Sequence, residues 1–562
     1  MKKMLKNFLI FLWMIVMGAS YWVFLPPLNP MSTGFWMFVL EGLGLAFVAL
    51  FVLALADSIG TAASNQRTKV GRGRKEVTPS STIYDKPLSW VGGSALVLLL
   101  LLMGMSFFNS RVFRAKSYAN VITVKEADFT KDFPETDIST LALLDRASAE
   151  KIGDTYLGTI DKVSQFGISD DYRQITIGKQ PYRVSPLEYK NFWKWLSNRT
   201  EGISYYVKVN QTTGKAELVK LDKAMKYSDS EYAFRDTMRY LRFKYPFTLF
   251  GDPSFEVDDD GNPYYVATIY QPKFMLSSKD PVGAILLDSV TGETKEYDLQ
   301  DIPKWVDRVF SANNVLTRVD DYYTYQDGFW NTVFSQTGVK QTTDSYNYIS
   351  IGSDIYLYTG ITSATADSSN LGFILVNMRT RQVTNYKLAS ATETAAQESA
   401  EGEVQEKDYE ATAPTLVKLD DKAYYLVSLK DDAGLVKSYA LVDAEDYQQV
   451  TVNNDIESLI SQFTDADTSA LSGASSSASG KAGKEVKMIS GTVEALASQM
   501  ISGSTVYYIS SSGEIYKVKA TEDTTDQLPF LKVGDRFTGQ LGKDNYLKNV
   551  EIVIAEKETE SR

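Results

Sequence analysis

The sequence of 562 residues contains no cysteine and no histidine. Without cysteine the chain forms no disulfide and offers no thiolate as a nucleophile or metal ligand. Without histidine it has no imidazole base, so triads of serine or cysteine with histidine, and zinc sites of the HExxH type, are excluded. Catalysis by carboxylates, by serine with lysine, or by tyrosine stays open.

Long apolar runs are confined to the first 108 residues. They are Phe8 to Leu25, Phe35 to Ala56 and Trp90 to Phe108, each close to the roughly 20 residues that a membrane-spanning helix needs. We therefore predict that residues 1–108 form a membrane anchor with three transmembrane helices. The first run is long for a signal peptide, so we interpret it as a retained anchor.

Basic residues near the spans predict the orientation in the cell membrane. Nine of them precede the first span or lie between the second and the third, whereas only Arg111, Arg114 and Lys116 directly follow the third. The positive-inside rule then places the N-terminus and the basic 57–89 loop in the cytoplasm and residues 109–562 outside it. The nine residues are Lys2, Lys3, Lys6, Arg67, Lys69, Arg72, Arg74, Lys75 and Lys86.

The charge of the exported part argues against nucleic acid as a partner. The chain has a net charge of −12 and its first 108 residues carry +5, which leaves −17 for residues 109–562. An acidic surface repels phosphate backbones. We expect the lipid bilayer and membrane or envelope proteins as partners, with wall polymer as a further candidate.

Glu41 is the single ionisable residue well inside a predicted span. Charge in hydrocarbon is costly, so such a residue is a candidate for transport or proton relay. No second intramembrane charge is available to pair with it. We favour the alternative that Glu41 takes part in helix packing around Gly42 and Gly44.

A hairpin pattern recurs in the exported region, most completely in Val282 to Leu299. There an apolar run ends at Asp288, and Gly292 follows four residues later. Aspartate or asparagine bonds its own backbone and glycine accepts positive φ, so this spacing predicts a tight turn. The same position is occupied, in three further copies, by Asn210, Asn377 and Asp443. Because two of the four are uncharged, we interpret Asp288 as a turn residue without a catalytic role.

Helical patterns separate these hairpins. Ser185, Pro186 and Glu188 match a capping box, and the aromatic stripe Tyr189, Phe192, Trp193 and Leu196 follows at helical spacing. We expect the stripe to pack in a core, with glycan or partner binding as the alternative. Further helices are predicted over 230–245, 302–310 and 137–147, and strands over 155–160 and 172–177.

Three consecutive aspartates, Asp258 to Asp260, precede Gly261 and resemble part of a calcium loop. The bidentate glutamate that closes such a loop is missing, because the twelfth position counted from Glu256 is Ala267. We therefore favour a solvated turn between two strands.

Composition marks two breaks and a final domain. Residues 390–414 are poor in large apolar side chains and predict a mobile insertion, and residues 464–484 form a Ser/Ala/Gly-rich linker. Residues 485–556 contain five short alternating segments with glycine-rich turns, which predict a small β-barrel of the OB type. Between the anchor and the linker we assign a mixed α/β region, 109–180, and the hairpin and helix repeats, 181–463.

The hairpins with apolar runs ending in Asp or Asn, followed by Thr-Gly, resemble PepSY-type domains. Together with the segments 264–267, 283–293, 301–309 and 327–331, they also resemble uncharacterised membrane-anchored proteins of Firmicutes. The resemblance implies a regulatory or inhibitory module outside the membrane. It transfers no catalytic residue.

The sequence thus predicts an α+β protein with three transmembrane helices, PepSY-like modules and an OB-like barrel. We expect a non-enzymatic, extracytoplasmic scaffold or interaction protein of the cell envelope, and we assign no catalytic, cofactor-binding or metal-binding residue and no cofactor. Two alternatives stay open: a component of a transport, signalling or envelope-morphogenesis complex, and a glycan hydrolase that uses two carboxylates.

Overall fold

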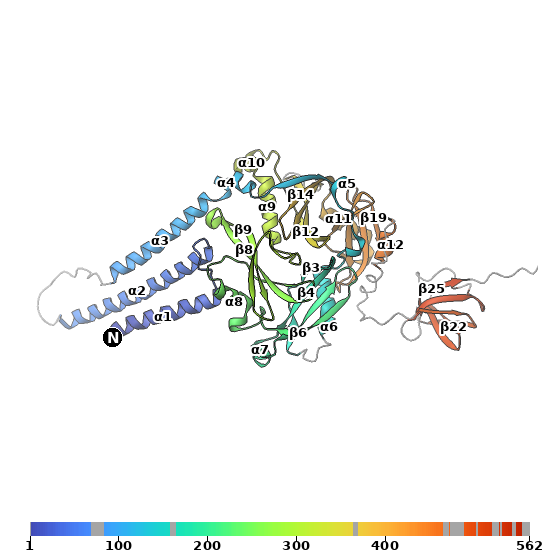
Figure 1. The fold of residues 1–562 in the computed structure, drawn as a ribbon, viewed down its shortest axis with the longest axis horizontal. Coiled ribbons are helices and arrows are strands. Elements are labelled where there is room, and N and C mark those ends of the chain that lie inside the picture. The colour runs from blue at the N-terminus through green and yellow to red at the C-terminus, as the bar shows by residue number, and fades with distance from the viewer. Residues whose placement is uncertain are drawn as a thin grey trace, which may run out of the picture. The chain divides into compact units, whose positions relative to one another are not determined.

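The computed structural model has a mixed α+β architecture, as expected (Figure 1). It describes residues 2–68, 84–157, 164–363, 369–464, 471, 488–501, 504–519, 528, 531–541 and 547–553. The chain divides into two compact units, Met1–Gly480 and Lys481–Arg562.

The first unit begins with three long apolar helices, α1 (Lys2–Phe24), α2 (Thr33–Thr68) and α3 (Asp85–Phe108). Each contains a stretch long and apolar enough to cross a membrane, which confirms three apolar helices where the spans were predicted. Most of the predicted basic loop over 57–89 lies outside the described residues, because residues 69–83, with Lys69, Arg72, Arg74 and Lys75, are not described.

Close packing joins α1 to α2 around Gly42. A Cβ atom on Gly42 would lie 3.2 Å from Met17 Cε, and Trp13 Nε1 donates to the Gly42 carbonyl at 2.9 Å. Ser20 Oγ donates to Glu41 Oε2 at 2.6 Å across the same contact. Glu41 therefore has a polar partner on the neighbouring helix, which supports its interpretation as a packing residue.

Four antiparallel sheets follow in chain order, each built mainly from consecutive strands. Sheet 1 contains β2 (Phe166–Ile168), β3 (Arg173–Ile177), β4 (Gln180–Tyr189), β5 (Ile203–Asn210) and β6 (Ala216–Met225). Sheet 2 contains β7 (Ser254–Val257), β8 (Pro263–Lys273), β9 (Ser278–Asp288) and β10 (Thr294–Asp298). Sheet 3 contains β11 (Lys340–Ile351), β12 (Asp354–Ser363), β13 (Ser369–Asn377) and β14 (Val383–Ala391), and β1 (Val124–Asp128) pairs with β14 in parallel. Sheet 4 contains β15 (Glu410–Ala411), β16 (Thr415–Leu419), β17 (Lys422–Lys430), β18 (Val436–Asp443) and β19 (Val450–Asn453).

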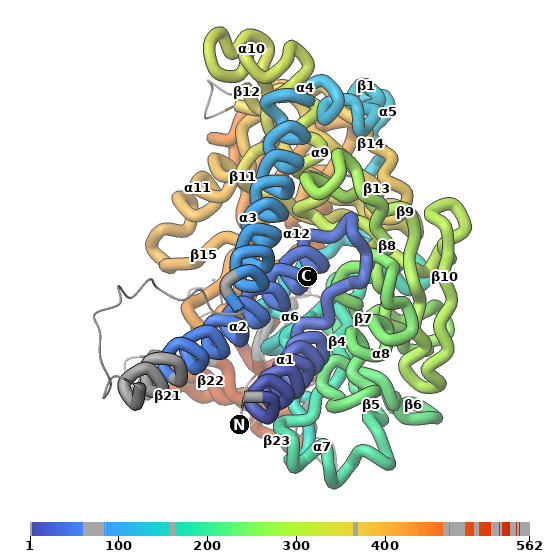
Figure 2. Tube along the Cα trace, turned by 90° about the vertical axis from the view of Figure 1, so that its left-hand side faces the viewer, coloured from blue at the N-terminus to red at the C-terminus, as the bar shows by residue number. Residues whose placement is uncertain are grey.

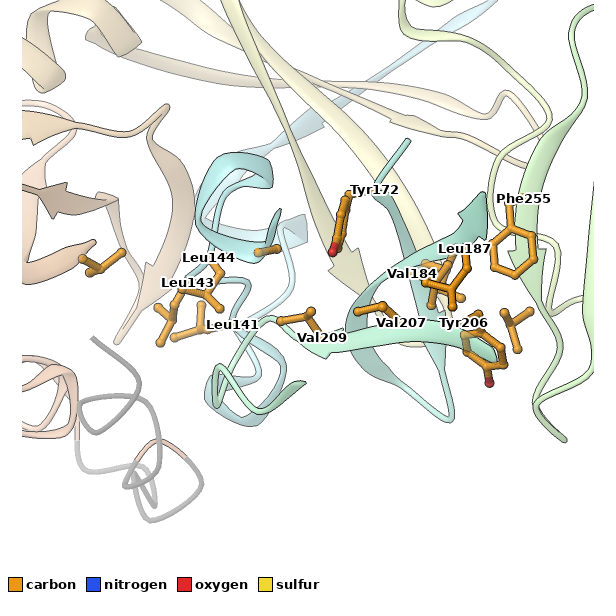
Figure 3. Packing of buried hydrophobic residues seen from close by; sticks show 14 of the residues in the cluster. Leu141, Leu143, Leu144, Tyr172, Val184, Leu187, Tyr206, Val207, Val209 and Phe255 are labelled. Carbon is orange, nitrogen blue, oxygen red and sulfur yellow. The ribbon is translucent and has the colours of Figure 1, made fainter. Parts of the chain in front are cut away.

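The sheets pack face to face in a closed ring. Sheets 1 and 2 share one apolar core, sheets 2 and 3 share a second, and sheets 3 and 4 share a third. Sheet 4 also joins the first core, through Leu426 and Leu441 among others, so the last sheet closes on the first. Figure 3 shows part of this core, where Tyr206 of sheet 1 lies near Phe255 of sheet 2. Tyr265 of β8 faces one core while Val266 faces the next, because successive side chains of a strand point to opposite faces. Closed rings of four-stranded sheets are typical of β-propellers.

The recurring hairpin joins the last two strands, in chain order, of each of these four sheets. The side chains of Asn210, Asp288, Asn377 and Asp443 each accept hydrogen bonds from the backbone N–H groups two and three residues ahead. Gly214 and Gly292 close two of these turns with φ of 68° and 78°. The predicted role of Asp288 in a turn is confirmed.

The two copies that lack glycine differ for separate reasons. Arg381 takes the glycine position with φ of 60°, and its guanidinium bonds Asp280 at 2.7 Å. The turn at Asp443 is one residue longer, since its N–H bonds the carbonyl of Gln449 instead of the residue five positions on. A longer turn does not need the left-handed residue at that position.

The other helices of the first unit lie between and outside the sheets. They are α4 (Arg111–Ala119), α5 (Phe129–Asp132), α6 (Arg146–Leu157), α7 (Phe192–Asn198), α8 (Thr237–Lys244), α9 (Ala312–Thr324), α10 (Phe329–Phe334), α11 (Glu393–Glu403) and α12 (Ile456–Ile460). Short 3₁₀ turns occur at Ile138–Thr140, Ala233–Arg235, Met275–Ser277 and Gln405–Lys407. The helix predicted over 230–245 is confirmed in its second half, by α8.

The capping-box prediction at Ser185 is wrong. Ser185 to Glu188 continue strand β4, where Ser185 pairs with Val207. Pro186, which has no N–H to donate, sits where pairing with β3 ends and pairing with β2 begins. The helix starts later, because Asn191 accepts hydrogen bonds from Trp193 N and Lys194 N and caps α7.

The prediction of a helix over 302–310 is also wrong, because its backbone N–H groups donate to acceptors on distant segments of the chain. The N–H groups of Val309 and Phe310 both bond the carbonyl of Met378, at 3.0 Å each. The N–H of Asp307 bonds Glu256 Oε2 at 3.1 Å. The segment consequently runs as an irregular chain between sheets 2 and 3.

The segment 390–414, predicted as a mobile insertion, contains regular elements: the end of β14, helix α11 and the short strand β15. Thr392 caps α11, whose Ala396 and Ala400 are fully buried against sheet 4. Small side chains at this spacing let the helix lie close to the strands. The low content of large apolar residues thus reflects tight packing.

The region 109–180 contains different elements from those predicted. A 3₁₀ turn over Ile138–Thr140 replaces the helix predicted over 137–147, and α6 occupies residues 155–157, where a strand was expected. Residues 158–160 lie outside the described residues. The strand predicted over 172–177 is confirmed as β3.

The second unit contains six strands in its described residues, in two three-stranded antiparallel sheets. They are β20 (Met488–Thr492), β24 (Arg536–Leu541) and β25 (Leu547–Val553), and β21 (Ala495–Ile501), β22 (Ser504–Ser511) and β23 (Glu514–Lys519). One small core, with Ile509, Val518 and Phe537, joins the sheets. These strands do not close into a barrel. The linker 464–484 lies outside the described residues except Thr464 and Leu471.

We predict that Asp288→Ala destabilises the ring, whereas Asp288→Asn does not. Alanine removes the acceptor of two backbone N–H bonds, at a cost of about 1–2 kcal/mol in the free energy of unfolding. Asparagine keeps the acceptor, as it does at Asn210 and Asn377. Thermal unfolding of the detergent-solubilised protein measures the difference. Equal midpoints for the two variants would contradict the assignment.

Candidate functional site

The centre of the ring lies where β3, β7, β11, β12 and β16 come together. Strand β3 contacts β7 and β12, and β11 contacts β16. Two adjoining cavities lie beside these strands, of about 60 and about 100 Å³. Cavities of this size hold several waters or a small ion and are smaller than drug-sized sites. Gln174, Arg183, Asn347 and Thr415 line the smaller one.

Three arginines surround Tyr348 of β11 at this centre. The guanidinium of Arg308 lies 4.2 Å from the centroid of the Tyr348 ring and donates to its hydroxyl. Burial raises the pKa of Tyr348, and the positive charges of Arg308, Arg173 and Arg183 oppose that rise. The arginines come from β3, from β4 and from the irregular segment before α9, so only the folded ring assembles them.

Arg183 is the arginine that lines the cavity. Its Nη1 donates to the carbonyl of Tyr172 at 3.2 Å, while its Nε is buried without a partner. Burial lowers its pKa to about 10, and the charge of Asp145 acts in the other direction. Asp145 itself bonds Lys430 Nζ at 2.7 Å, so it does not neutralise Arg183 alone.

Two carboxylic acids, Glu256 and Asp307, lie beside the arginines and are 0% and 1% exposed. Glu256 accepts the N–H of Asp307, and Asp307 Oδ2 accepts the N–H of Thr176. Burial raises the pKa of Glu256 to about 7, although Asp307 N–H and the charges of Arg173 and Arg308 lower it. Burial and the charge of Glu256 raise the pKa of Asp307 well above its ordinary value.

Several polar atoms at the centre have no partner among the residues that the structure describes. They include Gln174 Nε2 and Gln211 Oε1, from two side chains that are each 1% exposed, and both residues line the smaller cavity. Arg308 Nε, Glu256 Oε1 and Asp307 Oδ1 are also unpaired. Buried polar groups are costly without hydrogen bonds, so this centre is built to accept water or a polar ligand.

The central charge is positive when the two acids are protonated. Arg173 pairs with Asp171 at 3.1 Å and Asp145 with Lys430, which leaves Arg183 and Arg308 without a carboxylate partner in the described residues. Arginine donates planar pairs of N–H groups that suit carboxylate and phosphate oxygens. The site can therefore hold a small anionic group.

The candidates considered from the sequence lie elsewhere. Asp258 forms a turn between β7 and β8, where its Oδ1 accepts from Asp260 N and Asn262 N. Within the described residues, no group of three or more acidic side chains is placed to hold a metal ion. The calcium-loop alternative gains no support.

The aromatic stripe does not pack in the core as expected. Phe192, Trp193 and Leu196 are exposed, whereas Tyr189 and, on the other face of α7, Trp195 are buried. The shift of the helix start from Ser185 to Asn191 changes which face meets the sheet. Trp195 Nε1 donates to Glu231 Oε2 at 2.6 Å, which fixes α7 on sheet 1.

The sequence contains no local signal for the central site. Arg173, Arg183 and Arg308 are separated by up to 135 residues and belong to no recognised motif. The segment that carries Asp307 and Arg308 has a helical pattern, but its backbone bonds to Met378 and Glu256 override that pattern. Only the assembled ring brings the arginines together.

The chain matches no protein-family model and no curated protein. Among solved structures it is similar to a cobalt-substituted apocarotenoid oxygenase from Synechocystis, with 9% identity over 50% of this chain and 48% of that chain and a TM-score of 0.12. A polysaccharide lyase matches with 9% identity, over 69% and 78%, and a TM-score of 0.15. A levansucrase variant from B. megaterium matches with 10% identity, over 78% and 96%, and a TM-score of 0.17.

The chain spans about half the length of the apocarotenoid oxygenase structures that it matches. TM-scores of this size do not establish a common fold. No activity or ligand of these enzymes is therefore transferred to the central site.

We predict that Glu256→Gln changes the pH dependence of stability. The raised pKa means that folded Glu256 keeps a proton that the unfolded chain releases between about pH 4.5 and 7. The free energy of unfolding of the natural chain therefore falls as pH rises through this window. The uncharged variant escapes that loss, worth about 3 kcal/mol for a shift of this size.

Denaturant unfolding at pH 5 and pH 8 measures the effect. The free-energy difference between Glu256→Gln and the natural chain should shift in favour of the variant at pH 8. The matched control is Glu217→Gln, which changes an exposed glutamate on β6 paired with Lys208. A difference that stays equal at the two pH values would contradict the buried, protonated state of Glu256.

Proposed function

We propose that this chain is a membrane-anchored, extracytoplasmic interaction protein of the cell envelope that acts by binding and not by catalysis. In this proposal α1, α2 and α3 cross the cell membrane, the N-terminus and the 57–89 loop are cytoplasmic, and residues 109–562 stand outside. The support is the distribution of basic residues around three apolar helices. The partners are membrane or envelope proteins or wall polymer.

The observation that carries the binding role is the arginine site at the ring centre. Arg183 lines the smaller cavity, and Arg308 lies 4.2 Å from the centroid of the neighbouring Tyr348 ring. Within the described residues, the Nε of each has no partner. The site suits a phosphate or carboxylate group carried by an envelope partner or a wall polymer. A cavity of about 60 Å³ accommodates one such group and excludes a bulky ligand.

A glycan hydrolase is less well supported. That chemistry needs two carboxyl groups on either side of a bound sugar, with room for the polymer. Glu256 and Asp307 are almost fully buried, and each holds a backbone N–H of another segment. Their contacts favour a structural role.

A transport role through Glu41 has no support beyond its position in a span. Its carboxylate accepts a hydrogen bond from Ser20 of α1, as a helix-packing residue does. A signalling or morphogenesis complex stays compatible with the anchor and with binding outside the membrane.

We retain two finer proposals for the exported part. The first is the kinship with PepSY-like envelope proteins of Firmicutes, supported by the repeated hairpins. The second is an OB-like partner-binding module over residues 485–556, supported by short strands around one small core. Neither assigns a ligand.

The absence of cysteine gives a direct test of topology. We predict that Tyr447→Cys reacts with a membrane-impermeant maleimide on intact cells, whereas Lys75→Cys reacts only after lysis. Tyr447 is 42% exposed, so a cysteine there is accessible. Labelling of Lys75→Cys but not Tyr447→Cys on intact cells would reverse the orientation. The natural chain, which has no thiol, is the blank.

The binding role is tested with inorganic phosphate and isothermal titration calorimetry on the full chain in nanodiscs. We predict that Arg183→Gln weakens phosphate binding by roughly 10- to 100-fold, the loss expected for a charge-assisted hydrogen bond. The matched control is Arg146→Gln, which changes an exposed arginine paired with Glu150 on α6. No heat of binding in the natural chain, or equal affinity in Arg183→Gln, would overturn the anion site.

A further inference from the structure

An exposed apolar surface lies on the first unit beside the end of α1. We call it the aromatic patch, and its members are between 40% and 72% exposed. Monomeric proteins rarely expose so many large apolar side chains together unless they meet a membrane or a partner. The patch consists of Phe192, Trp193, Leu196, Tyr232, Phe234, Phe243 and Phe247.

The patch continues from the first membrane helix without a break. Trp22, near the end of α1, has its ring centroid 5.1 Å from that of Phe234, and Tyr21 lies 5.9 Å from Phe243. Phe234 and Phe243 are 6.0 Å apart. Phe234 is two residues from Tyr232, which belongs to the second half of the patch, on and beside α7.

The second half of the patch is itself closely packed. The rings of Phe192 and Tyr232 lie 5.3 Å apart, and Phe192 lies 5.4 Å from Trp193. Buried Trp195 lies 5.1 Å from Tyr232 beneath them. The exposed rings thus sit on a fixed base.

Hydrogen bonds to two backbone carbonyls hold the patch at the level where the first span ends. The N–H of Leu28 donates to the carbonyl of Pro246 at 2.7 Å, and Asn29 Nδ2 donates to the carbonyl of Phe247 at 2.9 Å. Leu28 and Asn29 belong to the short connection between α1 and α2. Both views show α8, which carries Phe243, beside the end of α1 (Figures 1 and 2).

Basic side chains border the same surface. The guanidinium of Arg239 lies 4.6 Å from the Trp22 ring centroid, and that of Arg199 lies 5.7 Å from Trp195. Lys244 ends α8. Cations at the border of an exposed aromatic surface match a headgroup layer, where phosphates lie above the acyl chains.

We propose that the aromatic patch rests in the interfacial layer of the lipid bilayer, on the side where α1 ends. The exposed rings of Trp193, Phe234 and Phe247 then lie among headgroups and upper acyl chains, as interfacial tryptophan and phenylalanine do. This contact attaches the ring of sheets to the membrane surface, in addition to the three spans. It fixes how the ring of sheets stands on the membrane and does not depend on the anion site.

The test uses single cysteines in the naturally cysteine-free chain. Trp193→Cys and Phe247→Cys are spin-labelled in the full-length protein in lipid nanodiscs. Accessibility of the label to oxygen, which concentrates in lipid, is compared with accessibility to a polar nickel chelate. We expect an oxygen-to-chelate ratio several-fold higher at both positions than at the controls Leu371→Cys and Tyr447→Cys, which replace exposed apolar side chains of sheets 3 and 4.

A further label at Leu99→Cys, on the exposed face of α3, reports whether that helix is in lipid. If Leu99→Cys shows a high oxygen-to-chelate ratio while Trp193→Cys and Phe247→Cys match the controls, the proposed contact between the patch and the bilayer is overturned. Low accessibility to both reagents at the two patch positions would also overturn it, since that result indicates a protein contact over the patch.

Discussion

Burial on both faces of the central strands is the constraint on which the first unit depends. In β8, for example, Tyr265 and Val266 are neighbours in sequence, yet each is 1–2% exposed and each belongs to a different core. A sheet of this kind must be covered on both sides, because either bare face would expose apolar area at about 25 cal/mol per Å². In a set of four such sheets, every apolar face is buried only if the last sheet covers the first. The three shared cores form this closed ring.

Closure of the ring also creates its polar centre. Where β3, β4 and β11 come together, Gln174, Arg183 and Asn347 line a small cavity and not an apolar core. The buried acids Glu256 and Asp307 tie β7 and β3 to the irregular segment that carries Arg308. The same contacts that connect sheets 1, 2 and 3 therefore position a cationic site. Loss of these contacts would also move the arginines apart.

A second polar network joins the anchor to the ring. Arg111, just after α3, bonds Asp321 of α9, and Asp321 also lies 3.5 Å from Arg318. Arg318 and Arg381 then share Asp280 of β9, at 3.4 and 2.7 Å. Buried ion pairs gain little net stability, but they specify one arrangement of the groups they join. The network explains why arginine, and not glycine, occupies the left-handed position of the third hairpin, and it ties α4 to sheets 2 and 3.

Local chemistry explains what could be predicted from the sequence. A run of apolar residues needs only its own helix to satisfy its backbone, so α1, α2 and α3 follow from composition. The turns at Asn210, Asp288 and Asn377 depend on a side chain bonding N–H groups two and three residues away, so they too are visible in the sequence. The class of fold and the repetition of hairpins follow from these local features.

The remaining features depend on contacts between distant segments. Ser185 lies in a strand because Val207 pairs with it, and residues 302–310 are not helical because Met378 and Glu256 accept their N–H bonds. The sequence by itself thus determined the spans, the turns and the absence of thiol and imidazole chemistry. Only the tertiary structure decided the closure of the ring, the meeting of the three arginines and the exposure of Trp193, because each requires partners far apart in the chain to lie side by side.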